Sequence, residues 1–432
     1  MRASVGRVGK VGGLGGSNPF TWANAITPAY AAFDFQNDRA IWDSARVANL
    51  AAVPNWTFTR ASTGYALDLA GNLVSFASGA LRRTDRGVLI EGARTNLCLQ
   101  SQTFDNASWA KNLCTITADA VAAPDGTLTA DKLICASGAS FLPNVNQAPT
   151  LADSTAYTAS CFMKAGEFSW GAIIIRSKDS ATETAAYFNL ATGALGSVGS
   201  GVTSTITALA NGWFFCTATK NSGAGATSPR FRVMVTTADN TDTPTGDGTS
   251  GIYIWGAQLE AASFASSYIP TTTASVTRAA DALSITGATL TGPLTIYGQW
   301  QKLGDDGATF SRVFEIEGST SDYIAVYHRH TTNIVRAFVR TASVDVADQL
   351  IGTAAIGTTQ TVCARFETNN VAGSLNGAAT GATDTSAALA AGFTVVRFGQ
   401  SSVGTSVLFG YISRIAIWNS AFTDAQLQTQ TT

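Results

Sequence analysis

Charge is scarce in this sequence of 432 residues, because only 13% of the residues are Asp, Glu, Lys or Arg. The 27 basic and 29 acidic side chains nearly cancel, so the formal net charge is −2. A protein without a basic surplus lacks the electrostatic attraction that draws nucleic acids and anionic membrane surfaces. We therefore expect no nucleic-acid partner.

Long apolar runs are also missing, because none reaches the roughly 18 residues that a membrane-spanning helix needs. The chain begins with MRASVGRVGKVGGLGG, which is basic and Gly-rich but is not followed by the apolar core of a secretory signal. We expect no membrane insertion, and folding in a reducing cytoplasm. The hydrophobic content of 45% is nevertheless high enough to exclude a disordered polymer.

Paired cysteines and clustered histidines are rare too. The six cysteines form no CxxC pair, and several lie in strand-like runs such as TASCFMK and FFCTATK, where a free cysteine packs as a small apolar residue. The only two histidines, His328 and His330, share one strand face, and no acidic residue stands beside them as a third metal ligand. We expect neither a disulfide framework nor a structural metal, and no cofactor.

Ca²⁺ is the one ion that the sequence leaves open. The loop TTADNTDTPTGDGTSG holds Asp239, Asp242 and Asp247, and Asp305 and Asp306 form a second acidic group. Oxygen-rich loops of sandwich domains bind Ca²⁺, but the spacing here does not match an EF-hand. A solvated loop is the favoured interpretation, and a Ca²⁺ site is the alternative.

Short runs of Thr, Val, Ile and aromatic residues fill the chain from Trp56 onward. WTFTR alternates between apolar and polar residues, and YALDLAGNLVSF reads as two strands joined by a turn. YTASCFMKAG, GAIIIRS, GWFFCTATK and IYIWGAQLE follow, and no helical period separates them. Strands at this spacing, without intervening helices, predict an antiparallel sandwich.

A second β set, from LTIYGQWQK to LFGYISRIAIW, follows an extended linker over residues 267–281. Near the end of the chain, Thr423 with Gln426 three residues later predicts the capped start of a short helix. The tripeptide Thr-Arg-Ala occurs at 59–61 and again at 277–279, but three residues do not establish a repeat.

The fold class predicted from these patterns is all-β. We expect two antiparallel β-sandwich (jelly-roll) domains in tandem, preceded by an irregular N-terminal arm and a small β region. The predicted boundaries are 1–45 for the Gly-rich arm, 46–95 for the small β region, 96–275 for the first sandwich and 276–432 for the second.

The stretch IEGARTNL packs Glu91, Arg94 and Asn96 around Gly92 in a weakly charged chain. These residue types suit either a catalytic site or a hydrogen-bonded joint between two pieces of chain. Their place between the small β region and the first sandwich favours a joint, in which Glu91 pairs with Arg94 and Gly92 permits a sharp bend.

Aromatic rings are the usual platforms for sugars, because the C–H faces of sugars pack on flat rings. Trp109 and Trp170 are the candidates for glycan binding, and Trp170, which follows a polar loop, is expected to be the more exposed. A core or subunit contact is nevertheless the favoured role for these rings. Core packing is the expected role of the strand residues Trp213, Tyr253 and Trp255.

Four segments stand out as a set: FTRAS (58–62), IEGARTNLCLQSQTFDNASWAK (90–111), APDGTLTADKL (123–133) and WGAQLEAASFASSYIPTTTASVTRAAD (255–281). In combination they resemble the fibre, spike and head-decoration proteins of tailed bacteriophages that carry a carbohydrate-binding-like jelly roll. GYISRIAIWNSAFTDAQLQ (410–428) resembles the end of a concanavalin A-like, laminin-G-type sandwich.

In concanavalin A-like glucanases, a Glu-Ile-Asp motif is followed by another Glu three residues after the Asp. The run VFEIEG places Glu315 and Glu317 on one strand face, about 6.5–7 Å apart, a separation compatible with glycoside hydrolysis. Thr320 stands where the last Glu should be, so one member of the expected pair is missing. An exposed strand face with solvated acids is the favoured interpretation.

The resemblance implies a non-enzymatic structural protein of a bacteriophage particle, such as a tail fibre, spike or head decoration, that displays its sandwiches for attachment to host-surface glycan. It also implies a homotrimer at the virion surface, made in the host cytoplasm and docked onto other virion proteins by its N-terminal arm. A polysaccharide-cleaving tailspike that uses Glu315 and Glu317 is the alternative. A bacterial surface or secreted carbohydrate-binding module is disfavoured by the missing signal peptide.

Overall fold

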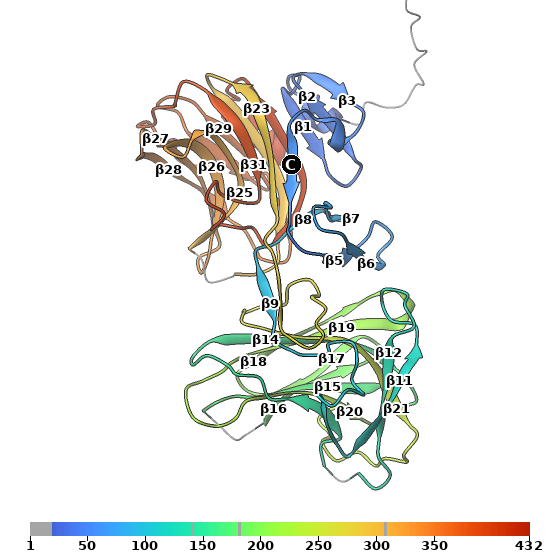
Figure 1. Cartoon of the computed structure of the whole chain (residues 1–432). Helices are drawn as coiled ribbons and strands as arrows, with labels where there is room; N and C mark the ends of the chain where they lie inside the picture. Colours follow the sequence, from blue (N-terminus) through green and yellow to red (C-terminus); the bar gives the residue numbers. More distant parts are fainter. Residues whose placement is uncertain (1–19, 140, 180–182, 306–308) are drawn as a thin grey trace, which may run out of the picture.

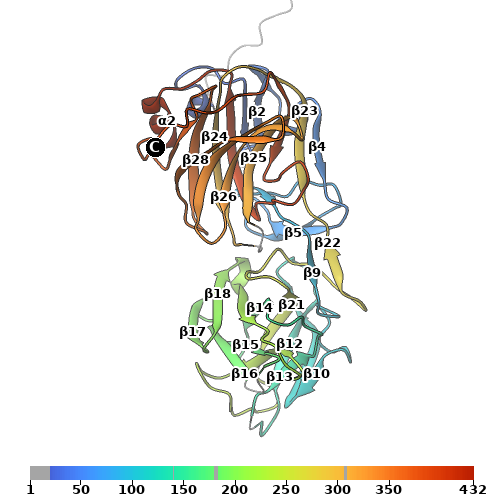
Figure 2. The ribbon, with the colours of Figure 1, turned by 90° about the vertical axis from the view of Figure 1, so that its left-hand side faces the viewer.

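The computed structural model describes residues 20–139, 141–179, 183–305 and 309–432 (Figure 1). Antiparallel strands make up nearly all of the secondary structure, and they form two β-sandwiches, which confirms the predicted all-β fold class. The two views show the sandwiches as separate lobes, one above the other, joined by extended chain (Figure 2).

The middle of the chain forms one lobe, which we call the middle sandwich. Its sheet I has the order β10 (Ala110–Asn112), β13 (Asn144–Gln147), β20 (Arg230–Thr236), β15 (Trp170–Arg176), β16 (Glu183–Asn189), β17 (Ala194–Val198). Its sheet II has the order β11 (Cys114–Val121), β12 (Ala130–Cys135), β21 (Gly251–Glu260), β14 (Ala156–Ala165), β19 (Trp213–Asn221), β18 (Val202–Ala208). The 3-10 turn η2 (Ala210–Gly212) precedes β19.

Alternation along the strands explains how this lobe forms its core. In β14, Cys161 and Met163 point inward and join the apolar cluster between the two sheets, whereas Phe162 points outward and joins a separate cluster on the outer face of sheet II. The period-two pattern therefore gives sheet II two apolar faces, and its outer face is available to pack against another part of the chain.

Both ends of the chain build the other lobe, which we call the terminal sandwich. Its sheet III has the order β3 (Ala45–Val47), β2 (Arg39–Trp42), β1 (Ala31–Asp34), β32 (Gly410–Trp418), β24 (Leu294–Lys302), β29 (Thr359–Phe366), β30 (Ala372–Leu375), with β8 (Gly87–Ile90) paired to β32 and β7 (Arg83–Thr84) paired to β8. Its sheet IV has the order β28 (Val344–Thr353), β27 (Ile334–Thr341), β26 (Asp322–Arg329), β25 (Phe310–Ser319), β31 (Phe393–Phe398), β23 (Ala282–Leu290), β4 (Trp56–Thr59).

The predicted division into a separate arm (1–45) and a separate small β region (46–95) is therefore wrong for the described residues. Strand β1 pairs with β32, with Phe33 opposite Ile415, and β4 pairs with β23, with Phe58 opposite Leu283. The physical reason is that these N-terminal strands complete the core of the terminal sandwich, where Phe33 packs edge-on against Phe398. Residues 1–19 of the predicted arm lie outside the described residues.

The middle sandwich is consequently an insertion in the terminal sandwich. The chain leaves the terminal sandwich after β8 and returns to it at β23. The two connections pair with each other, because β9 (Arg94–Asn96) and β22 (Val276–Arg278) form a small antiparallel ladder with Thr95 opposite Thr277. The predicted linker thus contains a strand.

Smaller elements follow their sequence signals. The hairpin β5 (Gly64–Leu67) and β6 (Leu73–Phe76) turns through Gly71, whose φ of 81° suits glycine. The helix α2 (Asp424–Thr431) begins with the predicted capping box of Thr423 and Gln426. The remaining short elements are α1 (Thr21–Asn24) and the 3-10 turn η1 (Leu50–Ala52).

All six cysteines are free and buried, as predicted, and burial raises the pKa of the Cys98, Cys161 and Cys216 thiols. In the described part of the chain, neither α-helix has the length and apolar character needed to cross a membrane.

Candidate functional site

Five charged side chains are buried together where the two sandwiches meet. We call Arg60, Arg82, Glu91, Arg278 and Asp281 the junction network, and each of them is at most 2% exposed. A group of buried ions in a chain with so few charges requires close pairing, because an unpaired ion loses its hydration without compensation.

Glu91 is fully paired within the junction network. Its Oε2 lies 2.6 Å from Arg82 Nη1 and 3.0 Å from Arg278 Nη1. Ser267 donates from its backbone N at 2.9 Å and from its hydroxyl at 2.6 Å. Burial alone would raise the pKa of this carboxyl, but Arg278, Arg82 and the Ser267 hydrogen bonds outweigh it and lower the pKa to about 2. Glu91 is therefore a structural anion.

Asp281 connects the remaining arginines. Arg60 Nη1 lies 3.2 Å from its Oδ1, Arg82 forms a close ion pair with its Oδ2, and the backbone N of Glu91 donates to Oδ2 at 2.8 Å. Arg60 and Arg278 are the central residues of the two Thr-Arg-Ala tripeptides, so each copy of this tripeptide supplies one arginine to the network. The network joins chain segments on both sides of the inserted middle sandwich.

The predicted ion pair between Glu91 and Arg94 does not form. Arg94 instead lies over the ring of Phe409, with its Cζ 4.1 Å from the ring centroid, and its Nε is 3.8 Å from the Glu260 carboxylate. Gly92 is needed for close packing rather than for a bend, since a Cβ there would approach the Phe409 ring to 2.4 Å.

Asn96 fixes the start of the middle sandwich. Its Nδ2 donates to the carbonyl oxygens of Ala257 and Ile269, and its Oδ1 accepts from the backbone N atoms of Cys98 and Leu259. All four hydrogen bonds of this buried amide are satisfied within the protein. The stretch IEGARTNL therefore places one anchor in the junction network, at Glu91, and a second in the middle sandwich, at Asn96.

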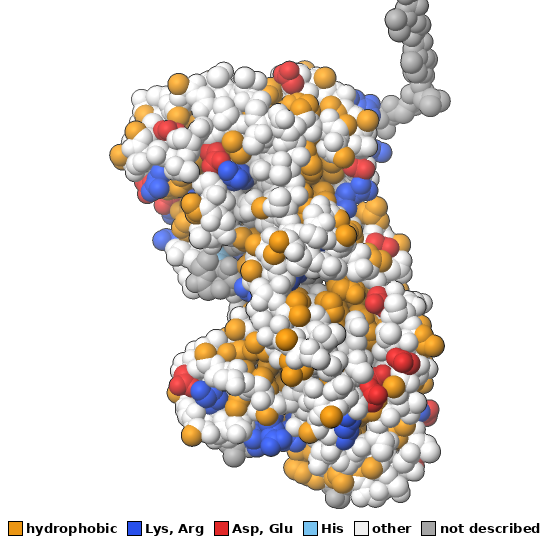
Figure 3. Space-filling view, viewed as in Figure 1, with side chains coloured by type: hydrophobic (Ala, Val, Ile, Leu, Met, Phe, Trp, Pro, Cys, Tyr) orange, Lys and Arg blue, Asp and Glu red, His pale blue; other side chains and the backbone are white. Residues whose placement is uncertain are grey.

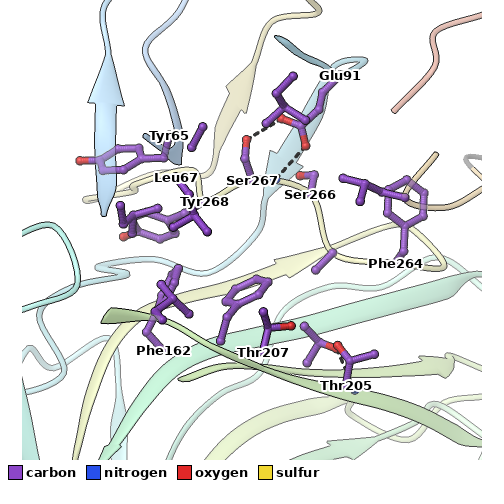
Figure 4. Close-up of a pocket in the computed structure, with 18 of the residues that line it drawn as sticks. Tyr65, Leu67, Glu91, Phe162, Thr205, Thr207, Phe264, Ser266, Ser267 and Tyr268 are labelled. Carbon is purple, nitrogen blue, oxygen red and sulfur yellow. Dashed lines mark hydrogen bonds between the residues drawn. The ribbon is translucent and has the colours of Figure 1, made fainter. Parts of the chain in front are cut away.

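A cleft of about 360 Å³, which we call the inter-domain cleft, opens beside the junction network (Figure 4). Its floor is the outer face of sheet II, and its walls are the β5–β6 hairpin, the loop 263–268 and the nearby edge of the terminal sandwich. The rings that line it are those of Tyr65, Phe162, Phe215, Phe264, Tyr268 and Tyr411. Threonine hydroxyls come from Thr203, Thr205, Thr207, Thr217 and Thr219.

The rings that line the cleft pack against one another, and two of its threonine hydroxyl groups form a hydrogen bond with each other. Tyr65 meets Tyr268 edge-on with centroids 5.3 Å apart, and Phe162 lies 4.8 Å from Phe215. Thr205 and Thr217 exchange a hydroxyl hydrogen bond of 2.7 Å. Among the lining residues the only charged side chains are Glu91, which the junction network neutralises, and Arg86. The cleft thus combines aromatic surface with hydroxyl groups and little net charge.

A second cavity, of about 440 Å³, lies on the outer face of sheet I. Its lining includes the rings of Phe141 and Tyr187, the Asn112 amide, and the ion pair between Arg232 and Glu183. Trp170 is partly exposed and packs against the apolar cluster of this same face. The role of Trp170 in glycan binding remains a prediction that this position permits.

Trp109 does not have the exposure that a sugar platform requires. It is 1% exposed and packs in the core of the middle sandwich, 4.9 Å from Phe104 and 6.0 Å from Phe231 between ring centroids. Its indole N–H donates to the Gln100 carbonyl at 2.9 Å. The glycan-binding prediction for Trp109 is therefore wrong, because the turn that precedes β10 folds this ring inward.

Glu315 and Glu317 are not solvated, contrary to the favoured interpretation of the sequence, since they are 1% and 5% exposed. Glu315 Oε2 lies 3.0 Å from Arg312 Nε, and the Ser402 backbone N donates to its Oε1 at 2.7 Å; burial raises the pKa of this carboxyl. Glu317 accepts from Arg397 Nε at 3.0 Å. Neither carboxylate lines the two cavities above.

The carboxylates of the metal-binding alternatives make local hydrogen bonds. Among the described residues, no three His, Cys, Asp or Glu side chains gather as a metal site would require. Asp247 accepts from the backbone N atoms of Thr249 and Ser250, and Asp239 accepts from Ser197, so both carboxylates stabilise local chain conformation. His328 is fully buried, and burial lowers its pKa to about 4. Asp306 lies outside the described residues.

Comparisons with known proteins give no information beyond the fold. No protein-family model and no curated protein matches the sequence. Among solved structures, a pentraxin from Limulus polyphemus is 14% identical, covers 34% of this chain and 74% of its own, and gives a TM-score of 0.27. The CBM40 of a Ruminococcus gnavus sialidase is 14% identical, covers 33% of this chain and 85% of its own, and gives a TM-score of 0.27. Domains LG4–5 of the mouse laminin α1 chain are 11% identical, cover 78% of this chain and 91% of their own, and give a TM-score of 0.22. Likeness at this level extends no further than β-sandwich architecture.

Proposed function

We propose that this chain is a non-enzymatic structural protein of a bacteriophage particle that attaches to glycan through the inter-domain cleft. The observation that carries the glycan-binding part is the lining of the cleft. Aromatic rings pack against the C–H faces of sugars, and threonine hydroxyls both donate to and accept from sugar hydroxyls. A cleft with mostly apolar walls and a few placed polar groups is the usual form of a small-ligand site.

The virion part of the proposal rests on the sequence resemblance and is supported by what the resembling segments do. Residues 58–62, 90–111 and 255–281 supply Arg60, Glu91 and Arg278 with Asp281 to the junction network. In this proposal, the shared pattern encodes the rigid connection of two sandwiches on a particle surface. Rigid connection suits a protein that must display a binding site at a fixed distance from its point of attachment.

Assembly forms a further part of the proposal. The chain would be made in the host cytoplasm, would form a homotrimer, and would lie at the virion surface without a bound cofactor. Because the chain from Phe20 onward packs in the terminal sandwich, the proposal assigns docking onto other virion proteins to residues 1–19.

Changes in the cleft test the proposed glycan binding. Phe215→Ala removes a ring from the floor, and Thr205→Val replaces an exposed hydroxyl by a methyl group of similar size. We expect each change to weaken binding of neutral bacterial oligosaccharides by about tenfold or more, because one stacking contact or one hydrogen bond is worth roughly 1–2 kcal/mol. A glycan array followed by calorimetry on the best oligosaccharide measures this loss.

Leu350→Ala serves as the control, since it removes an exposed apolar side chain from the terminal sandwich that lines neither cavity. It should leave binding in the cleft unchanged. Neutral oligosaccharides that bind equally well to the wild type, Phe215→Ala and Thr205→Val would contradict the proposal.

A polysaccharide-cleaving role for Glu315 and Glu317 is the competing function, and we propose that the protein lacks it. This proposal is supported by the burial of both carboxylates in ion pairs and by their absence from the lining of the two cavities described above. The purified protein should release no reducing ends from host capsule or lipopolysaccharide. Release of reducing ends that Glu315→Gln abolishes, in a variant with an unchanged circular dichroism spectrum, would show that this expectation is wrong.

A further inference from the structure

Three arginines project from neighbouring strands on the outer face of sheet I. Arg176 of β15 lies directly opposite Arg230 of β20, and Arg232 is two residues further along β20, on the same face. Figure 3 shows basic side chains grouped on the lower lobe, in the region of β15 and β16 in Figure 1. Like charges directly opposite each other on paired strands are unfavourable, so this arrangement carries a cost in the free protein.

Internal carboxylates neutralise only part of this charge. Glu183 of β16 forms a close ion pair with Arg232. The other two guanidinium groups donate hydrogen bonds to neutral groups: Arg176 donates to the Ser228 carbonyl at 2.9 and 2.7 Å, and Arg230 donates to Asn146 Oδ1 at 3.1 Å. Glu183 also stands opposite Arg176 in the pairing of β15 with β16, so one carboxylate is shared among the three arginines. Burial lowers the pKa of Arg232, Glu183 raises it, and Arg230 and Arg176 lower it further, which reflects the crowding of positive charge.

The cavity of about 440 Å³ lies beside these arginines. Arg232 and Glu183 form part of its lining, and the rings of Tyr187 and Phe141 and the Asn112 amide form another part. Phe141 is 53% exposed, so its ring is accessible to a ligand in the cavity. Asp242 lines the cavity near Tyr187, so the lining holds the mutually neutralised pair of Arg232 and Glu183 and one further carboxylate, while Arg176 and Arg230 stand outside the lining.

We propose that the outer face of sheet I binds an anionic saccharide, with its acidic group on Arg176 and Arg230 and its sugar ring in the cavity beside Tyr187 and Phe141. Guanidinium groups recognise carboxylate and phosphate through paired, planar hydrogen bonds, and such a ligand relieves the repulsion between opposing arginines. The rings and the amide recognise the rest of the sugar. This site is separate from the inter-domain cleft, because it lies on the other sheet of the middle sandwich and shares no lining residue with it.

Titration of the full chain with three probes tests this proposal. Trigalacturonate carries carboxylates, glucose 6-phosphate carries a phosphate, and maltotriose is neutral. We expect at least one anionic probe to bind in calorimetry at low salt and more weakly at 0.5 M NaCl, whereas any binding of maltotriose should not depend on salt. A response to trigalacturonate alone assigns a carboxylated sugar, and a response to glucose 6-phosphate alone assigns a phosphorylated sugar.

The double variant Arg176→Gln/Arg230→Gln should weaken binding of the anionic probe at least tenfold. Arg340→Gln is the matched control, since Arg340 is a partly exposed arginine of the terminal sandwich that pairs with Asp345, and it should leave the affinity unchanged. Phe215→Ala, in the inter-domain cleft, should also leave it unchanged, so failure of one site is distinguishable from failure of the other.

Thermal unfolding separates loss of binding from loss of folding. Saturating anionic probe should raise the unfolding midpoint of the wild type but not that of the double variant, and the circular dichroism spectrum of the double variant should show that it is folded at the temperature of the titration. Failure of both anionic probes to bind the wild type, or equal affinity of the double variant and the wild type, would overturn the proposal.

Discussion

Replacing Asp281 by asparagine is expected to lower the free energy of unfolding by about 3–5 kcal/mol, the usual cost of removing one partner from a buried ion pair. Asparagine fills the same space but leaves Arg60 and Arg82 facing each other with Glu91 as the only remaining anion of the junction network. It also removes the carboxylate oxygen that accepts from the Glu91 backbone. Urea unfolding followed by circular dichroism measures the loss.

Asp345→Asn provides the matched comparison, because it is the same substitution at an ion pair with Arg340 in which the two side chains are 52% and 34% exposed. Exposed ion pairs contribute about 0–1 kcal/mol to the free energy of unfolding, so this variant should unfold at nearly the same urea concentration as the wild type. If Asp281→Asn and Asp345→Asn unfolded at the same urea concentration, the junction network would not hold the two sandwiches as argued above. The free energy of unfolding of an ordinary domain is only about 5–15 kcal/mol, so the expected loss is a large part of the total.

Trp109→Ala is expected to destabilise the protein by about 3–5 kcal/mol, the cost of emptying a buried aromatic site. The change removes contacts with Phe104 and Phe231 and leaves the Gln100 carbonyl without its indole donor. Trp170→Ala should cost much less, because that ring is only partly buried at the outer face of sheet I. Thermal unfolding of both variants measures the difference.

The same two variants address the roles predicted for tryptophan from the sequence. Trp109→Phe should lose much less stability than Trp109→Ala, because phenylalanine fills most of the apolar space although it lacks the indole N–H. A Trp109→Ala variant that remained as stable as the wild type but no longer bound saccharide would restore the sugar-platform interpretation.

The strands and the closing helix were predictable because they depend on local pattern. Alternation in TASCFMK and the Thr423–Gln426 capping box are both found as expected. The partners of the N-terminal strands were not predictable, because β1 pairs with β32 nearly four hundred residues away, and nothing in the apolar run Ala31–Phe35 identifies that partner. Pairing across such a separation is decided by the assembled core rather than by local sequence.

The candidate sites were predictable only in part. IEGARTNL correctly drew attention to the junction, yet Arg82 and Asp281, which complete the charge pairing, stand in segments with no unusual spacing. The threonine row of β18 was not predicted to line a site, and the rings opposite it come from other parts of the chain. Arg176 and Arg230 lie 54 positions apart in the chain and become neighbours only through the pairing of β15 with β20.

The insertion of one sandwich into the other determines the order in which the chain can fold during synthesis. All strands of sheets I and II lie between Ala110 and Glu260, so the middle sandwich can close as soon as that segment has left the ribosome. Sheet III cannot close until β32 has been made, because this strand separates β1 from β24. The apolar strand β1 must therefore wait for β32, which is made much later, and synthesis of β32 controls when sheet III is complete.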